Sequence, residues 1–148
     1  MRTVFRILFL VPIGFILACY GAAFALLWPF LSLSDQALSD PFVVVELAFG
    51  FTAQAAQVGW TALLPFVAFF VVSETFSLRG VLVHLLAGLA GGLAACHLGP
   101  APAELSLQTA QIVAGLSFAL IYWIVAGHRA GLWRQRAPAS LPAQRTEP

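Results

Sequence analysis

Hydrophobic residues are concentrated in long runs that are separated by short polar stretches. The runs cover residues 4–30, 41–72, 81–98 and 105–126. A helix needs about 20 predominantly apolar residues to cross a hydrocarbon core of about 30 Å, and each run has that order of length. The pattern predicts an all-α protein, an integral membrane bundle of four transmembrane helices.

The second run has a clear start and is unusually long. Ser39-Asp40-Pro41 places a side-chain acceptor at the N-cap and a proline at the first helical position, so we expect a helix to begin at Pro41. A helix from there to Val72 would measure about 48 Å, which exceeds the apolar thickness of a bilayer. It must therefore project, tilt or bend, and Gly50 and Pro65 are the expected places for a bend.

Basic and acidic residues occupy alternate connections between the runs. The basic residues are all arginines and lie before the first run, between the second and third, and after the fourth: Arg2, Arg6, Arg79, Arg129, Arg134, Arg136 and Arg145. The other two connections carry Asp35, Asp40 and Glu104. By the positive-inside rule, this split predicts that both termini are cytoplasmic, N-in and C-in.

Composition excludes several classes of protein. Hydrophobic residues make up 61% of the chain and charged residues 9%, too little polar surface for a soluble globule. The helices leave room for one domain, residues 1–136, followed by a Pro- and Ala-rich cytoplasmic tail, residues 137–148, that we expect to be disordered. A net charge of +1 offers no long-range attraction for nucleic acid, so we expect no such partner.

The first run also has features of cleaved signals. Ala23-Phe24-Ala25 has the small-x-small form of a signal-peptidase site, and Ile16 to Cys19 loosely matches a lipoprotein box. The chain stays apolar through Leu27, beyond both sites, where a mature N-terminus would be polar. We therefore expect a retained transmembrane helix, with cleavage as the alternative.

One side of the third helix is built from small residues. At 100° per residue, five positions fall within about 100° of one another, and we call them the small-residue face: His84, Gly88, Gly91, Gly92 and Ala95. The G-x-x-x-G spacing lets another backbone approach closely. We expect this helix-packing face to pack inside the bundle, with homo-oligomerisation as the alternative.

Amides and hydroxyls line one side of the second helix. The polar seam comprises Glu46, Gln54, Gln57 and Thr61, with Gln111 of the fourth helix expected to meet it. One interpretation is interhelical hydrogen bonding worth about 0.6 kcal/mol per bond; the other is a small vestibule open to the outside. Glu46 is expected near the outer interface, so no carboxylate lies at the midplane, which argues against ion-coupled transport.

Residue sets typical of catalysis or metal binding are missing from the sequence. His84 and Tyr122 should lie at similar depth, where we expect a polar contact between them rather than haem ligation, because His97 and His128 lie at other depths. Cys19 and Cys96 lack a C-x-x-C spacing. We expect no catalytic, cofactor-binding or metal-binding residues, no cofactor and no enzymatic activity.

The end of the fourth run resembles a known type of sequence. Residues Ile121 to Gly131, IYWIVAGHRAG, are similar to an ending found in small four-helix inner-membrane proteins of alphaproteobacterial type. The resemblance implies a bacterial inner-membrane location and no activity. We therefore expect a multi-pass inner-membrane protein that acts as a structural or accessory component, packing with itself or a larger membrane complex; the alternative is a small oligomeric permease or channel.

Overall fold

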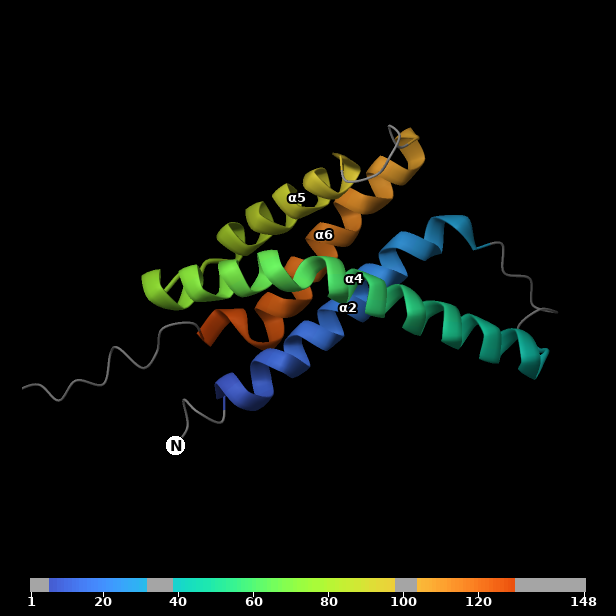
Figure 1. Cartoon of the computed structure of the whole chain (residues 1–148), viewed down its shortest axis with the longest axis horizontal. Helices are drawn as coiled ribbons and strands as arrows, with labels where there is room; N and C mark the ends of the chain where they lie inside the picture. Colours follow the sequence, from blue (N-terminus) through green and yellow to red (C-terminus); the bar gives the residue numbers. More distant parts are fainter. Residues whose placement is uncertain (1–5, 32–38, 98–103, 130–148) are drawn as a thin grey trace, which may run out of the picture.

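The computed structural model describes residues 6–31, 39–97 and 104–129, and these residues form only helices, turns and short connections. The elements in chain order are η1 (Arg6–Leu10), α2 (Val11–Leu27), η2 (Trp28–Phe30), α4 (Pro41–Phe76), α5 (Val81–His97), α6 (Leu105–Val125) and η3 (Gly127–Arg129). The all-α prediction is confirmed for this part of the chain (Figure 1). The predicted tail, residues 137–148, lies outside the described residues.

The start of α4 follows the expected capping chemistry. The backbone N–H of Phe42 donates to Oδ1 of Asp40 over 2.9 Å, and Pro41 occupies the first turn. The far end differs from the expectation, because α4 continues to Phe76 instead of ending at Val72. The hydroxyls of Ser73 and Thr75 donate to the carbonyl oxygens of Phe70 and Val71, so these polar residues are satisfied inside the helix.

The helix α4 passes through Pro65 without interruption and bends near its middle (Figure 1). Pro65 has no N–H to donate to the carbonyl of Thr61, which weakens the helical ladder at that turn. The hydroxyl of Thr61 donates to the carbonyls of Gln57 and Val58 in the preceding turn. As a result, residues 41–50 of α4 extend away from the other helices, whereas Phe51, Thr52 and Ala55 still contact α2.

The helix α6 lies at the centre of the packing. It contacts α2 along one side and α5 along another, and α2 also packs against α4. By contrast, α4 and α5 barely touch each other. The four helices therefore form an open arrangement rather than a closed bundle, with a gap between α4 and α5.

Small residues bring α5 and α6 into close contact. A Cβ atom on Gly88 would collide with the carbonyl oxygen of Gly115, and one on Gly92 would lie 2.8 Å from the carbonyl oxygen of Gln111. Real Cβ atoms essentially never come closer than 3.0 Å to such neighbours. The separation of the two backbones therefore depends on these glycines.

Aromatic rings fill the core between α2, α4 and α6. The ring of Phe66 lies 4.6 Å from that of Phe15 and 4.9 Å from that of Tyr122, measured between centroids. Phe118 completes the group, 6.1 Å from Phe66. These contacts fix the C-terminal half of α4 against the α2–α6 pair, and so set one side of the gap described above.

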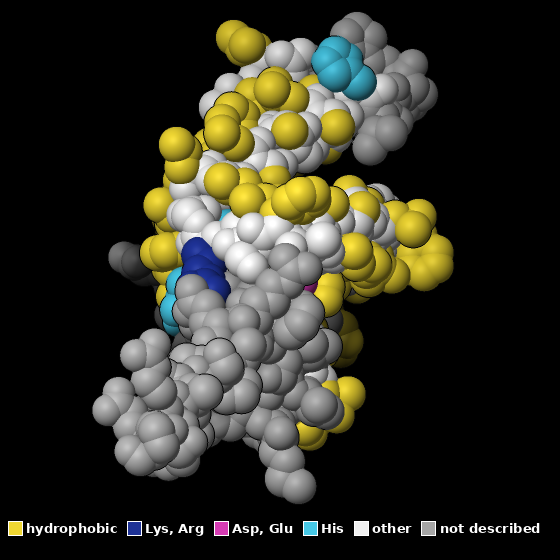
Figure 2. Space-filling model, turned by 90° about the vertical axis from the view of Figure 1, so that its left-hand side faces the viewer, with side chains coloured by type: hydrophobic (Ala, Val, Ile, Leu, Met, Phe, Trp, Pro, Cys, Tyr) yellow, Lys and Arg dark blue, Asp and Glu magenta, His cyan; other side chains and the backbone are white. Residues whose placement is uncertain are grey.

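Three described segments are long and apolar enough to cross a membrane: 8–30, 41–76 and 105–125. The fourth helix, α5, is apolar but has 17 residues. Large hydrophobic side chains cover much of the exterior, and Figure 2 shows them spread over the described part of one face. The prediction of a membrane protein is confirmed to this extent.

The described arginine-bearing segments gather at one end of the molecule. The start of η1, the turn between α4 and α5, and η3 all lie at the left of Figure 1. A hydrogen bond of 2.8 Å from Nε1 of Trp123 to the carbonyl oxygen of Arg79 joins α6 to that turn. The helices therefore run alternately up and down, as the charge pattern requires.

Candidate binding cavity

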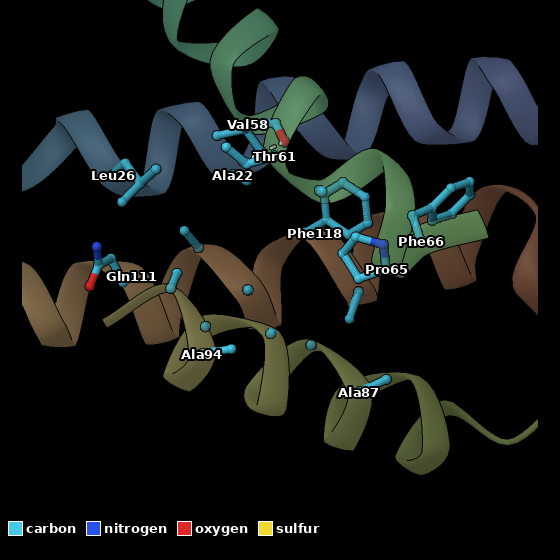
Figure 3. Close-up of a pocket in the computed structure, with 18 of the residues that line it drawn as sticks. Ala22, Leu26, Val58, Thr61, Pro65, Phe66, Ala87, Ala94, Gln111 and Phe118 are labelled. Carbon is cyan, nitrogen blue, oxygen red and sulfur yellow. Dashed lines mark hydrogen bonds between the residues drawn. The ribbon is translucent and has the colours of Figure 1, made fainter. Parts of the chain in front are cut away.

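The gap between α4 and α5 forms a partly open cavity of about 580 Å³. Side chains from α2 and α6 form its floor, and α4 and α5 form its two walls (Figure 3). The cavity exists because α4 leans away from α5, and because the residues of α5 on this side are mostly glycine and alanine. Nothing larger than Leu26 projects into it from α2.

The small-residue face is divided between two environments. Gly88 and Gly92 lie against the backbone of α6, as described above. Around Gly91 there is open space, because a Cβ atom there would meet nothing within 4 Å. All five residues of the face line the cavity, but the close packing expected along the whole face is missing at Gly91 within this chain.

The polar seam supplies the other wall. Gln54, Gln57 and Thr61 of α4 line the cavity together with Gln111 of α6. Glu46 is not among the lining residues and lies exposed in the N-terminal half of α4. The structure therefore brings four of the five seam residues around one space, and it adds the small-residue face opposite them.

The expected hydrogen bonds between helices are not made by the glutamines. Within the described part of the chain, Gln54, Gln57 and Gln111 have no hydrogen bond to another helix, and Oε1 of Gln111 is buried without any partner. The hydroxyl of Thr61 bonds only within α4. A polar contact between α2 and α4 occurs instead from the hydroxyl of Tyr20 to that of Thr52, at 3.5 Å.

His84 is 1% exposed and lies at the opposite end of the cavity from Gln111. Its Nδ1 lies 3.0 Å from the carbonyl oxygen of Gly80, which can only accept, so Nδ1 carries the proton. Its Nε2 has no partner among the described residues and lies beside Gly127, where a Cβ atom would be 2.7 Å away. The ring packs edge-on against Phe69.

The hydrogen bond expected between His84 and Tyr122 is therefore not formed. The two ring centroids are 6.2 Å apart and tilted by 31°, an arrangement of packing. Gly80 and Gly127 explain the difference. The carbonyl oxygen of Gly80 accepts the hydrogen bond from Nδ1, and Gly127, just after α6, lies against the Nε2 edge of the ring.

The cavity changes character along its length. On α4 the lining residues are polar in the first half and apolar after Thr61, where Pro65, Phe66 and Phe69 take over. Figure 3 shows Gln111 near Leu26 at one end, and Pro65, Phe66 and Phe118 toward the other. Asp, Glu and Arg are absent from the described lining residues. The space is therefore uncharged, with an amide end and an aromatic end.

Sequence reasoning identified the polar and small lining residues but not the apolar ones. Ala22, Leu26, Phe66 and Phe118 lie in uniformly apolar runs, where no pattern separates a residue that faces a cavity from one that faces lipid. Only the angle of α4 decides which of them line the space.

The remaining candidate residues stay apart. Cys19 is buried and Cys96 partly buried, both as free thiols, and Sγ of Cys96 donates to the carbonyl of Gly92. Among the described residues no three His, Cys, Asp or Glu side chains come together as a metal site would require. The chain as a whole matches no known protein family, no curated protein and no solved structure.

Proposed function

We propose that this chain is a multi-pass protein of a bacterial inner membrane, with both termini cytoplasmic, that serves as a structural or accessory component of a membrane assembly. In this proposal it packs with further copies of itself or with a larger complex. The topology is supported by the described arginine-bearing segments, those with Arg6, Arg79 and Arg129, which gather at one end of the molecule. The accessory role is supported by the length and exposure of α4.

The helix α4 is longer than a membrane crossing requires. Its 36 residues measure about 54 Å, against about 30 Å of hydrocarbon. A straight helix would need a tilt of about 55°, beyond the 0–40° found for transmembrane helices. Since contacts with α2 begin at Phe51, Thr52 and Ala55, the preceding residues 41–50 have few partners in their own chain.

The divergent segment of α4, residues 41–50, is apolar nevertheless. Phe42 is 84% exposed, Phe49 73% and Trp60, at the bend, 79%. Apolar surface that extends beyond the hydrocarbon core needs cover, and another membrane protein or a second copy can provide it. This uncovered segment, residues 41–50 of α4, is the observation that carries the accessory role.

Cross-linking tests this proposal most sharply. In a background without Cys19 and Cys96, Phe49→Cys should cross-link in native membranes to a second copy or to another protein. Ala55→Cys, on the same helix but buried against α2, is the matched control and should not. Native mass measurement should then show a species heavier than the 15.8 kDa chain. A monomer that cross-links at neither position would contradict the accessory role.

A second candidate function, a small oligomeric permease or channel, is favoured by the cavity lining. Gln54 and Gln57 would offer a solute hydrogen bonds in the outer half of the membrane. The test is labelling by a membrane-impermeant thiol reagent added from outside, with Gln54→Cys and Gln57→Cys compared. The accessory proposal predicts slow labelling at both, and rapid labelling at the deeper Gln57 position would favour the permease.

A further inference from the structure

We propose that the cavity between α4 and α5 binds a neutral amphiphile, one molecule with an uncharged carbonyl or hydroxyl head and an apolar body. The head would lie among Gln54, Gln57 and Gln111, and the body would extend toward Phe66 and Phe69. This binding site is independent of whether the chain is an accessory component or a permease.

The size of the cavity fits a small molecule. Ligand pockets measure about 300–1,000 Å³ and are mostly apolar with a few placed polar groups, and this cavity has about 580 Å³ with such a lining. The apolar walls beyond Thr61 also disfavour filling by ordered water, because a buried water needs two to four polar partners.

The unpaired amides indicate what the head must offer. A glutamine both donates and accepts, and three of them line the cavity without a hydrogen bond to another helix in the described part of the chain. Oε1 of Gln111 is already removed from solvent, and Gln111 lines the cavity. Leaving a buried polar atom such as Oε1 of Gln111 unpaired is unfavourable, so a head that pairs with it is stabilised there.

The absence of charge in the described lining selects a neutral head. No Asp, Glu or Arg side chain contributes to the described walls, so a carboxylate or ammonium would be desolvated without a counter-charge. His84 does not supply one, because its Nδ1–H is engaged by Gly80 and its Nε2 edge lies against Gly127. Carbonyl and hydroxyl groups remain as the chemistry that the amides recognise.

The body of the molecule is accommodated by the rest of the cavity. Gly91 leaves open space on α5, and Pro65, Phe66 and Phe69 provide an apolar wall on α4. The cavity is also partly open between the two helices, so a molecule dissolved in the bilayer can enter sideways. The glutamine end lies away from the arginine-bearing end, so the proposed topology places the head in the outer half of the membrane.

The test uses the full chain in nanodiscs and a photoreactive diazirine on a long-chain alcohol, with the matched fatty acid and amine as charged probes. We expect saturable cross-linking of the alcohol to peptides of α4 and α5, and labelling by the charged probes about tenfold weaker. Gln111→Leu should weaken labelling by the alcohol about tenfold. Equal labelling by all three probes, or labelling without saturation along every helix, would overturn the proposal.

Cavity-filling variants locate the site. Gly91→Leu should abolish saturable labelling, because the side chain enters open space. Ala90→Leu, on the neighbouring exposed position that does not line the cavity, is the matched control and should bind normally. If Gly91→Leu lowers the helix content, Ala94→Leu fills the same cavity from another position and should give the same loss. Normal labelling in a folded filling variant, or a change of oligomer mass in place of a loss of labelling, would contradict the site.

Discussion

The contact between α5 and α6 leads to opposite predictions for two glycines that are three residues apart. In Gly88→Ala, the new methyl group would collide with the carbonyl oxygen of Gly115 and lie 2.5 Å from Cβ of Ala119. One obstacle is backbone and the other is the first atom of a side chain, so neither can rotate away. The helices must separate, and overpacking of this kind costs about 1–3 kcal/mol.

In Gly91→Ala the methyl group meets nothing within 4 Å. The variant loses no contact and gains helix propensity, which favours alanine over glycine by up to about 1 kcal/mol. Gly92→Ala should fall between the two, because its nearest neighbours, both backbone atoms, would lie at 2.8 and 2.9 Å, a less severe overlap than at Gly88.

The free energies of unfolding of these three variants and the wild type can be ranked by titration with a denaturing detergent at constant lipid composition. Circular dichroism monitors the loss of helix during the titration. We expect the order Gly91→Ala, wild type, Gly92→Ala, Gly88→Ala, from most to least stable. The reasoning is refuted if Gly88→Ala is as stable as Gly91→Ala, since α5 would then not approach α6 through Gly88.

The remaining predictions concern polar groups. The double variant Gln54→Leu, Gln57→Leu should change the free energy of unfolding by less than about 0.5 kcal/mol, because neither amide forms a hydrogen bond to another helix. A loss near 1 kcal/mol in the same detergent titration would show that these amides do form hydrogen bonds between helices. Trp123→Phe removes the donor to the carbonyl oxygen of Arg79 and should destabilise the chain by about 1 kcal/mol. Backbone hydrogen exchange at Gly80 and Val81 should become faster. Unchanged exchange at these two amides would show that the hydrogen bond does not stabilise the turn.

Features determined by local chemistry could be predicted from the sequence. The start of α4 depends on Asp40 and Pro41 alone, and the positions of the four helices follow from the lengths of the apolar runs. The end of α4 lies beyond the predicted Val72, because the apolar run ends there but the helix continues through Ser73 and Thr75 to Phe76. Their hydroxyls bond to the preceding turn, and hydrogen bonds of this kind leave no mark in the hydrophobic pattern.

The candidate site could be predicted only in part, because it depends on how the helices face one another. The periodicity correctly grouped Gln54, Gln57 and Thr61 on one side of α4, and Gly88, Gly91 and Gly92 on one side of α5. It could not show that α5 turns Gly88 and Gly92 toward α6 and Gly91 toward open space. In lipid, both sides of a helix can be apolar, so hydrophobicity does not distinguish the side that contacts another helix from the side that faces lipid.

The topology of the chain is the central claim, and reporter fusions test it most directly. The charge pattern and the alternating helices predict that fusions at Arg79 and Arg145 are active in the cytoplasm, and that fusions at Gln36 and Pro100 are active outside it. The 17-residue α5 is the critical segment, because it is the shortest of the helices proposed to cross. A C-terminal reporter active on the outer side would require an odd number of crossings and would contradict the account.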